Sequence, residues 1–470
     1  MATTVGFAPA LLAKSLGFAG IAAAAAMLIG VPAGFRLWRC RGTWCIAGRA
    51  MLLSLLVVPP IVQAIPWAGI GLQGWVGALW TESLVLAPVA ALFSFAAFSL
   101  VDPEAVASAR VLLGEWSAVR KILFPLALPL LSAGACFAVV LALVDHTVPS
   151  IFSANTYAFA VFAEFAAGHS AVTTLLAALP LVAAATAVVL VGAGRLRYGF
   201  GAGSWVRSAP LVLALPRWWR FAESGAVLVL ALHATMIGVA LLSALLSGGQ
   251  LLSRLQAYGP DTVTSLVVAA STVLLVLPLA AAVAVRLERA APSTTGWWIL
   301  AVLPLAVPAP LVGVGLIAVA STLPGIPLYG TLAMPVLGAV SRFAPIAAVL
   351  LAAGRRSLDP GLVEAAAVLG WRRGESLLRL LLPLHLPALL AVSVFGFSQA
   401  VGEVVVTLLL VPPGDSTLAL RLYDALHYGA TGAAALAGVL MVALLLVPAS
   451  LLYLLRRQQQ PSTYRHTPEA

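Results

Sequence analysis

Long runs of apolar residues alternate with short polar loops along the whole chain. Eleven of these runs approach or exceed the roughly 20 helical residues needed to cross the hydrocarbon core of a bilayer. They lie at 15–35, 50–72, 79–100, 124–144, 173–193, 224–246, 264–285, 297–320, 329–353, 387–411 and 430–455. Continuous apolar runs suit helices, whereas a membrane barrel would show alternating strands. The pattern therefore predicts an all-α polytopic membrane protein with about 11 transmembrane helices.

Composition agrees with residence in lipid. Of the 470 residues, 62% are hydrophobic and 9% are charged, and the mean hydropathy is +1.06. A soluble domain does not tolerate such values. The net charge of +10 comes from basic residues scattered singly or in pairs between apolar runs. Membrane topology explains this scatter better than a nucleic-acid partner does, and we expect no nucleic acid.

The basic residues also predict an orientation. If the N-terminus lies outside, all but four of the 26 basic residues fall in the cytoplasm. The exceptions are Lys14, Arg254 and Arg421, which fall outside, and Arg342, which lies within a span. Lys and Arg are enriched in cytoplasmic loops. We therefore expect an external N-terminus, an uncleaved first span and a cytoplasmic C-terminus.

No residue cluster indicates a catalytic or metal site. Cys40, Cys45 and Cys136 form neither a CxxC pair nor a metal-ligand spacing with histidine, and we interpret them as ordinary small apolar residues. The six histidines are far apart in sequence and are expected to be loop or packing residues. A GxxxxGK[ST] phosphate loop is also absent. We expect no enzyme activity and no cofactor bound by this chain.

One segment occurs twice. It reads VDPEAVASARVLLGEWSAVRKILFPLALPLL from Val101 and LDPGLVEAAAVLGWRRGESLLRLLLPLHLPALL from Leu358. An Asp-Pro pair, a glycine and two prolines recur in the same order, and both copies run in the same direction relative to the membrane. This predicts two parallel pseudo-repeats. We divide the chain into a first half at 1–194 with about five spans, a cytoplasmic linker at 195–223, a second half at 224–457 with about six spans, and a polar tail at 458–470.

The second copy carries a motif with a defined spacing. Its residues are Glu364, Ala365, Ala366, Gly370, Leu380, Leu382 and Pro383. They resemble the EAA motif of ABC importer permeases, in which this segment is a cytoplasmic coupling helix that docks on the ATPase subunit. An alanine-rich loop helix without a partner would also contain EAA and glycine. The full spacing through Pro383, the predicted cytoplasmic side and the second copy favour the motif.

The first copy departs from that motif. It has Ser108, Ala109 and Arg110 where EAA is expected, and Pro125 follows Gly114 by 11 residues, whereas Pro383 follows Gly370 by 13. We expect this shortened loop still to couple, less tightly or with different contacts.

Three charged residues are candidates for a translocation path. Arg342 lies deep in its predicted span, where a charge is expensive and usually faces a cavity or a partner. Asp145 and Glu403 each follow the second proline of their repeat by 16 residues. We expect these residues to line or gate the path between the halves. A structural ion pair between Arg342 and Glu403 is the equal alternative.

The continuations VDHTVPSIFSANTYAFAVFAEFAAG from Val144 and LLLVPPGDSTLALRLYDALHYGA from Leu408 look like the fused two-half permeases of the iron(III), thiamine and phosphonate group. The resemblance implies a type I permease fold in a bacterial inner membrane, two copies of an ABC ATPase subunit that uses the ATP, and an extracytoplasmic solute-binding protein. It implies iron(III) as substrate, or otherwise thiamine, phosphonate or another small anion. A secondary active transporter with two repeated bundles is the alternative.

Overall fold

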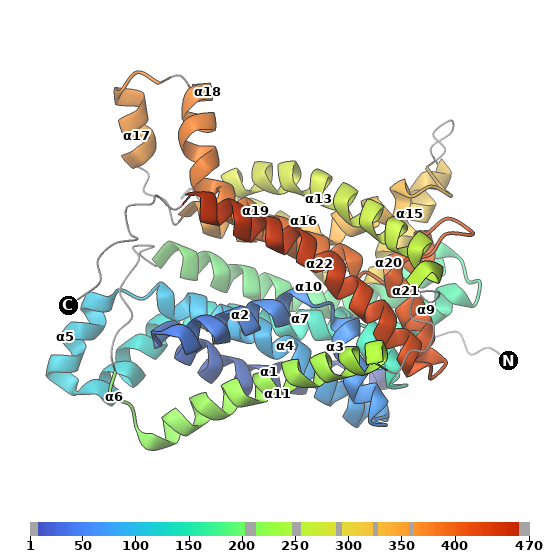
Figure 1. Cartoon of the computed structure of the whole chain (residues 1–470), viewed down its shortest axis with the longest axis horizontal. Helices are drawn as coiled ribbons and strands as arrows, with labels where there is room; N and C mark the ends of the chain where they lie inside the picture. Colours follow the sequence, from blue (N-terminus) through green and yellow to red (C-terminus); the bar gives the residue numbers. More distant parts are fainter. Residues whose placement is uncertain are drawn as a thin grey trace.

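The structure is a computed structural model that describes residues 8–202, 213–246, 255–287, 294–322, 328–356, 361–371 and 373–459. Within these ranges the regular structure is entirely helical, without a strand. The predicted all-α class is therefore confirmed. Figure 1 shows an elongated bundle in which most long helices run along the horizontal axis.

The N-terminal part of the bundle contains long helices joined by short ones. In chain order they are α1 (Pro9–Arg39), α2 (Thr43–Val57), α3 (Pro60–Gly69), α4 (Gly74–Ser99), α5 (Pro103–Leu113), α6 (Glu115–Ala118), the π-helix η1 (Val119–Leu123), α7 (Phe124–Val144), α8 (Thr147–Ile151), α9 (Tyr157–Ala166) and α10 (Ala171–Ala202). The predicted linker began at residue 195, whereas α10 continues through Ala202.

The C-terminal part begins with one additional helix and then repeats the same order. The elements are α11 (Arg217–Leu246), α13 (Gly259–Leu287), α14 (Thr294–Val302), the 3-10 helix η2 (Leu303–Ala306), α15 (Ala309–Thr322), α16 (Ala333–Arg356), α17 (Gly361–Val368), α18 (Arg373–Ser376), the π-helix η3 (Leu377–Leu381), α19 (Leu382–Val401), α20 (Val405–Leu410), α21 (Leu418–His427) and α22 (Thr431–Gln459). The series from α13 to α22 parallels the series from α1 to α10.

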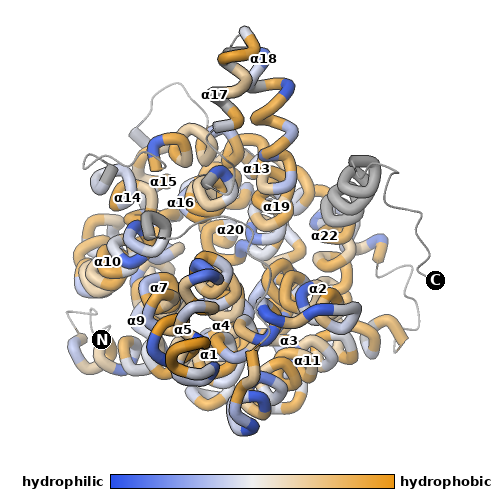
Figure 2. Tube along the Cα trace, turned by 90° about the vertical axis from the view of Figure 1, so that its left-hand side faces the viewer, coloured by the Kyte–Doolittle hydropathy of each residue, from blue (hydrophilic) through white to orange (hydrophobic). Residues whose placement is uncertain are grey.

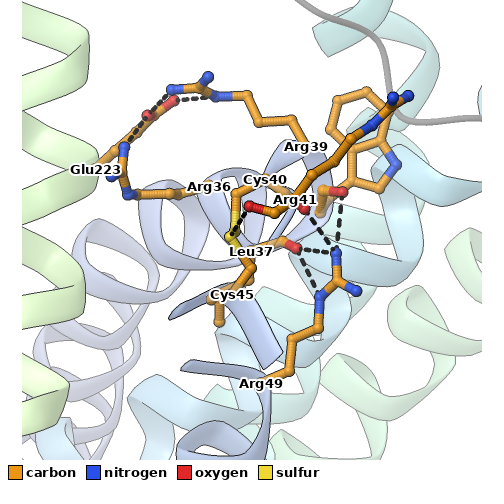
Figure 3. The surroundings of a disulfide bond; sticks show 9 residues. Arg36, Leu37, Arg39, Cys40, Arg41, Cys45, Arg49 and Glu223 are labelled. Atoms are coloured by element: carbon orange, nitrogen blue, oxygen red, sulfur yellow. Dashed lines mark hydrogen bonds and ion pairs between the residues drawn. A yellow bond between two sulfur atoms is a disulfide. The ribbon is translucent and has the colours of Figure 1, made fainter. Parts of the chain in front are cut away.

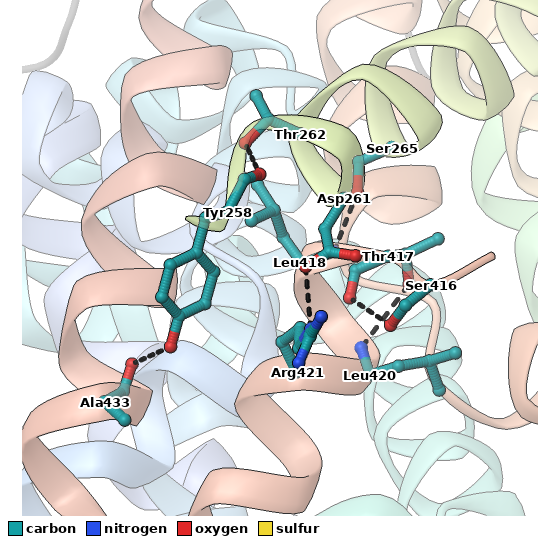
Figure 4. Close-up of polar contacts among 10 residues, drawn as sticks. All are labelled: Tyr258, Asp261, Thr262, Ser265, Ser416, Thr417, Leu418, Leu420, Arg421 and Ala433. Atoms are coloured by element: carbon teal, nitrogen blue, oxygen red, sulfur yellow. Dashed lines mark hydrogen bonds and ion pairs between the residues drawn. The ribbon is translucent and has the colours of Figure 1, made fainter. Parts of the chain in front are cut away.

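Matching hydrogen bonds support this pseudo-repeat. Thr156 and Thr417 cap the short helices α9 and α21 through their side-chain oxygens. The hydroxyl of Ser15 in α1 accepts a hydrogen bond of 2.8 Å from the backbone N–H of the residue after Thr156. The hydroxyl of Ser265 in α13 accepts one of 2.9 Å from the residue after Thr417, as Figure 4 shows. Each series therefore ties its short capped helix to its first long helix in the same way.

Eight helices of the described chain are long and apolar enough to cross a membrane. Two further helix pairs are long and apolar enough only when each pair is taken together, and both are sharply bent. The bend is 95° between α2 and α3, and 99° between the segment 295–306 and α15. Each bend contains proline, Pro59 with Pro60 in the first and Pro308 in the second, and proline cannot continue a helix. The predicted runs 50–72 and 297–320 are thus sharply bent helix pairs, each a broken span or a re-entrant loop. The eleventh predicted span falls on α22, whose side chains are described only to residue 446.

The predicted run 387–411 is wrong at its C-terminal end. Helix α19 ends at Val401, and a separate short helix, α20, begins at Val405. Gly402 lies against Pro59, where an added Cβ would come within 2.5 Å of the proline ring. The chain turns at this glycine and the following Glu403, so apolar content alone overestimated the span.

Helix α11 packs on the N-terminal part of the bundle although it precedes the second repeat in sequence. It contacts α1, α2, α3 and α4, and also α22. The side chain of its Glu223 is fully buried and forms an ion pair with Arg39 of α1. A second ion pair joins the same carboxylate to the guanidinium of Arg36 at 3.6 Å (Figure 3). The division into two halves and a linker stays a prediction.

A disulfide joins Cys40 to Cys45 in the turn between α1 and α2 (Figure 3). Gly42, with φ of +100°, reverses the chain and brings the two Cα atoms to 5.9 Å. Interpreting these two cysteines as ordinary apolar residues was therefore wrong, whereas Cys136 is free and half-buried. Beside the disulfide, Arg49 donates hydrogen bonds to the carbonyls of Leu37, Trp38 and Cys40 and so caps the end of α1.

Elements of the N-terminal and C-terminal series pack against each other. Helix α10 contacts α14, η2 and α15, and its counterpart α22 contacts α3. Ser398 of α19 donates a hydrogen bond to the carbonyl of Val57 at the end of α2. Figure 2, a view along the bundle, shows hydrophobic residues along nearly all of these helices. Buried residues of both series form one continuous apolar cluster.

Candidate functional site

The first loop that resembles a coupling segment consists of α5 and the turn after it. Asp102 caps the helix by accepting a hydrogen bond of 2.9 Å from the N–H of Glu104. The helix contains Ser108, which is exposed, and Ala109, which is buried. It ends at Gly114, whose φ is +78° and whose N–H donates to the carbonyl of Arg110. Glycine adopts such a positive φ without strain.

The second loop likewise has a glycine with positive φ after its helix, but a different hydrogen bond at the turn. Helix α17 contains Glu364, whose side chain is outside the described set, with Ala365 exposed and Ala366 buried. Gly370 also has a φ of +78°, and the N–H of the next residue, Trp371, donates to the carbonyl of Ala366 at 3.1 Å. The Asp-Pro pair at 359–360 and Arg372 lie outside the described residues.

Each loop leads into a long helix through a π-helix. Pro125 and Pro383 both lie in the first turn of the following α-helix, directly after η1 and η3, and Leu380 is a half-buried residue of η3. Leu381, which precedes α19, has helical angles, so the helix is already continuous there. Proline lacks an N–H and collides with the carbonyl four residues earlier, and the wider π-turn relieves that collision.

Both loops lie at one end of the bundle and expose apolar side chains. Figure 1 shows α5 and α17 at the left end and the N-terminus, α9 and α21 at the other. Two residues before the glycine, Leu112 is 83% exposed and Val368 is 88% exposed. Val111 and Leu113 beside the first tip and Leu369 beside the second are also exposed, and a contiguous exposed apolar patch is typical of a surface that binds another protein. Sequence spacing located both loops but did not predict which side chains form their tips.

The first loop is held by residues that sequence reasoning did not single out. Glu115 receives a hydrogen bond of 2.6 Å from Arg110 and another from the backbone N–H of Ala214. The ring of Trp116 lies 5.3 Å from that of Trp218 and 5.9 Å from that of Trp219, at the start of α11. The segment before α11 therefore braces the first loop. Nearly 100 residues separate the partners, so no local pattern revealed the contact.

We expect Glu115→Gln to loosen the first loop, because it removes the negative charge that accepts hydrogen bonds from both Arg110 and the backbone N–H of Ala214. The pair is about one-third exposed, so the loss should be small, on the order of 0.5–1 kcal/mol. Tryptic cleavage after Arg110 in the detergent-solubilised protein should become about threefold faster. Glu104→Gln, at an exposed acid on the same helix, is the control and should leave the rate unchanged. Equal rates in the two variants would contradict the brace.

At the other end of the long helices, Arg342 of α16 forms an ion pair with Glu403. The Glu403 side chain is 5% exposed and that of Arg342 is 25% exposed. Glu403 also accepts a hydrogen bond of 3.1 Å from the N–H of Val406 and so caps α20. The guanidinium lies 5.8 Å from the ring of Phe343. The structure thus brings together two of the three residues expected along the path.

Asp145 occupies the equivalent place in the N-terminal series. Its carboxylate accepts hydrogen bonds from the N–H groups of Thr147 (3.1 Å) and Val148 (3.0 Å) and caps α8. Burial raises the pKa of Asp145 above its ordinary value, and the helix N–H groups and the charge of Arg342 oppose that rise. The spacing of 16 residues after a proline therefore identified two acids with the same local geometry.

Two further buried polar residues belong to this network and were missed. Glu82 of α4 is 3% exposed, its Oε2 has no hydrogen-bond partner, and its carboxyl lies close enough to Asp145 to interact with it electrostatically. His146 is 1% exposed, its Nδ1 has no hydrogen-bond partner, and burial lowers its pKa to about 3. From the sequence we expect the histidines to be loop or packing residues only. His146 lies in addition beside these charged residues. Among the described residues, no group of His, Cys, Asp and Glu could hold a metal ion.

Comparison with known families gives a match over part of the chain. Residues 293–458 match the family model described as binding-protein-dependent transport system inner membrane component. The matched region extends over α14 to α22 apart from the last residue, and contains the second loop together with Arg342 and Glu403. No curated protein matches the chain. The C-terminal part of the chain, with one of the two loops and half of the charged network, is therefore similar to the inner membrane component of binding-protein-dependent transport systems.

Proposed function

We propose that this chain is the membrane-spanning permease subunit of an ATP-driven ABC importer, with two permease halves fused in one polypeptide. The observation that carries the proposal is the pair of loops at one end of the bundle. Each combines a short helix, a glycine with φ of +78° and an exposed apolar tip. The family match contains the second loop, and the repeated element order explains why there are two.

The two loops would each dock on one ABC ATPase subunit, which binds and hydrolyses the ATP. The exposed tips at Leu112 and Val368 supply apolar area, and the left-handed glycines fix the direction in which the chain leaves each helix. An extracytoplasmic solute-binding protein would then meet the opposite end, where α9 and α21 lie (Figure 1). The expected orientation, with the N-terminus outside, fits this assignment.

The charged network would form part of the gate between the halves. Asp145 and Glu82 come from the first half, and Arg342 and Glu403 come from the second. A buried charge cluster at a boundary between two bodies is costly to separate, so it favours one arrangement of the halves until the ATPase subunits supply the energy. Such bistability is what alternating access requires.

For the substrate we retain iron(III), with thiamine, phosphonate or another small anion as the other members of the group that the sequence resembles. Support for this choice comes from the sequence resemblance alone. The alternative of a secondary active transporter gives no role to two matching loops outside the bundle.

Co-purification with candidate ATPase subunits tests the proposal. The intact chain should retain the ATPase, and Val368→Asp, which places a charge on the exposed tip, should reduce its recovery at least tenfold. Tyr428→Asp is a matched control, because Tyr428 is equally exposed at 88% but lies just after α21, at the opposite end. Equal recovery with both variants would overturn the docking role.

A further inference from the structure

A cavity of about 770 Å³ lies between α10 and α14. These helices come from different halves of the chain and contact each other, and Figure 2 shows them side by side. The α10 wall carries Leu190, Ala193, Gly194, Arg197 and Tyr198, and the α14 wall carries Thr295, Trp298 and Ile299. None of these lining residues is acidic. The charged network described above does not extend to this place.

The cavity is apolar at one end and basic at the other. Leu190, Ala193 and Ile299 form an apolar wall, and Leu190 and Ile299 also expose surface on the outside of the bundle. One helical turn further, Arg197 donates a hydrogen bond to the hydroxyl of Thr295 across the cavity. A guanidinium has five N–H donors, so this contact orients it while donors remain for an anion.

The length of helix α10 places the border between the apolar and the basic end of the cavity at the membrane surface. Its 32 residues would span about 48 Å at 1.5 Å per residue, well beyond the roughly 30 Å of the hydrocarbon core. The last turns, which contain Arg197 and Tyr198, therefore extend into the headgroup region. Tryptophan and tyrosine concentrate at that depth, and the cavity has Tyr198 and Trp298 there.

Further basic and apolar features fit a lipid. Arg195 is exposed on the same turn as Arg197, and Arg286 lies over the ring of Trp297 at 5.5 Å, next to the cavity wall. A narrower apolar crevice of about 30 Å³ shares Ala193 with the cavity and runs between α7 and η2. The site thus offers a basic head and an apolar groove in the order in which a phospholipid presents its phosphate and its acyl chains.

We propose that this cavity binds one anionic phospholipid, with its phosphate on Arg197 and an acyl chain along Leu190 and Ile299. Anionic headgroups are favoured because the rim carries arginines and none of the described lining residues is acidic. The lipid would bridge the two halves at the end of the bundle that carries the loops. The inference stands independently of the ATPase docking, since it needs only the membrane and the cavity.

The test is lipid binding to the full-length protein in detergent, measured by native mass spectrometry after titration with phosphatidylglycerol or phosphatidylcholine. The intact chain should bind one phosphatidylglycerol at least several-fold more tightly than phosphatidylcholine. Arg197→Gln should lower that affinity about fivefold, the contribution expected of one arginine at a membrane surface. Arg220→Gln is the control, because Arg220 is an exposed arginine at the start of α11 and does not line the cavity.

A second variant tests the groove without changing a charge. A Cβ added at Gly194 would meet no atom within 4 Å, so Gly194→Leu should fold and fill the cavity. It should abolish the one-lipid complex with phosphatidylglycerol. Equal binding of the two lipids, unchanged binding in both Arg197→Gln and Gly194→Leu, or competition by inorganic phosphate alone would overturn the proposal.

Discussion

Replacing Gly370 by valine should reduce ATP-coupled transport at least tenfold while the chain remains folded in the membrane. Gly370 has a φ of +78°, a region that costs an L-residue about 1–2 kcal/mol and a β-branched residue more. With valine at this position the backbone would move to a negative φ. The exposed side chains of Val368 and Leu369 before the turn would then point in another direction. Transport in vesicles that also contain the ATPase subunit is the measurement.

A matched glycine separates this effect from general damage. A Cβ at Gly315 in α15 meets no atom within 4 Å, and Gly315 has no positive φ. Gly315→Val should therefore retain transport. Gly114→Val should be harmful too, but less so than Gly370→Val, because the contacts of Glu115 and Trp116 hold the first loop. Normal transport by Gly370→Val would contradict the role of the second loop.

Breaking the Arg342–Glu403 pair should produce the second large effect. Arg342→Met leaves Glu403, which is 5% exposed, without its partner, and removal of one member of a buried pair costs on the order of 3–5 kcal/mol. The double variant Arg342→Met/Glu403→Gln should regain most of that loss, because no unpaired charge remains. Thermal unfolding of the purified protein measures the change in stability.

Transport by the same variants decides between a gate and a structural pair. If the network is part of the gate, the double variant should be stable yet defective in transport. Normal transport with lowered stability in the single variants would leave only the structural role. Arg220→Met is the control, because Arg220 is exposed at the start of α11 and its replacement should change the stability by less than about 0.5 kcal/mol.

The sequence predicted the long helices because an apolar run of membrane length has few alternatives in lipid. It did not predict where such runs break. Both bends and the end of α19 depend on single residues, Pro59, Pro308 and Gly402, whose effects disappear in an average over 20 positions. The helical class was therefore predictable, whereas the positions of the breaks required the structure.

The candidate site was predictable where the repeat duplicated it. Gly114 and Gly370, like Asp145 and Glu403, were found because each pair occupies equivalent positions. Glu82 has no acidic counterpart at a matching position, and the contact between Glu115 and Ala214 joins residues 99 positions apart. No local sequence pattern marks such contacts, so only the three-dimensional structure identifies them.

Site-specific cross-linking tests the central proposal most directly. In a chain with Cys40, Cys45 and Cys136 replaced by serine, single cysteines at positions 112, 368 and 428 would be reacted with a short bifunctional reagent in membranes containing the ATPase subunit. Cysteines at 112 and 368 should each form a cross-linked product with that subunit, and cysteine at 428 should form none. Cross-linking from 428 but not from 112 or 368 would contradict the account.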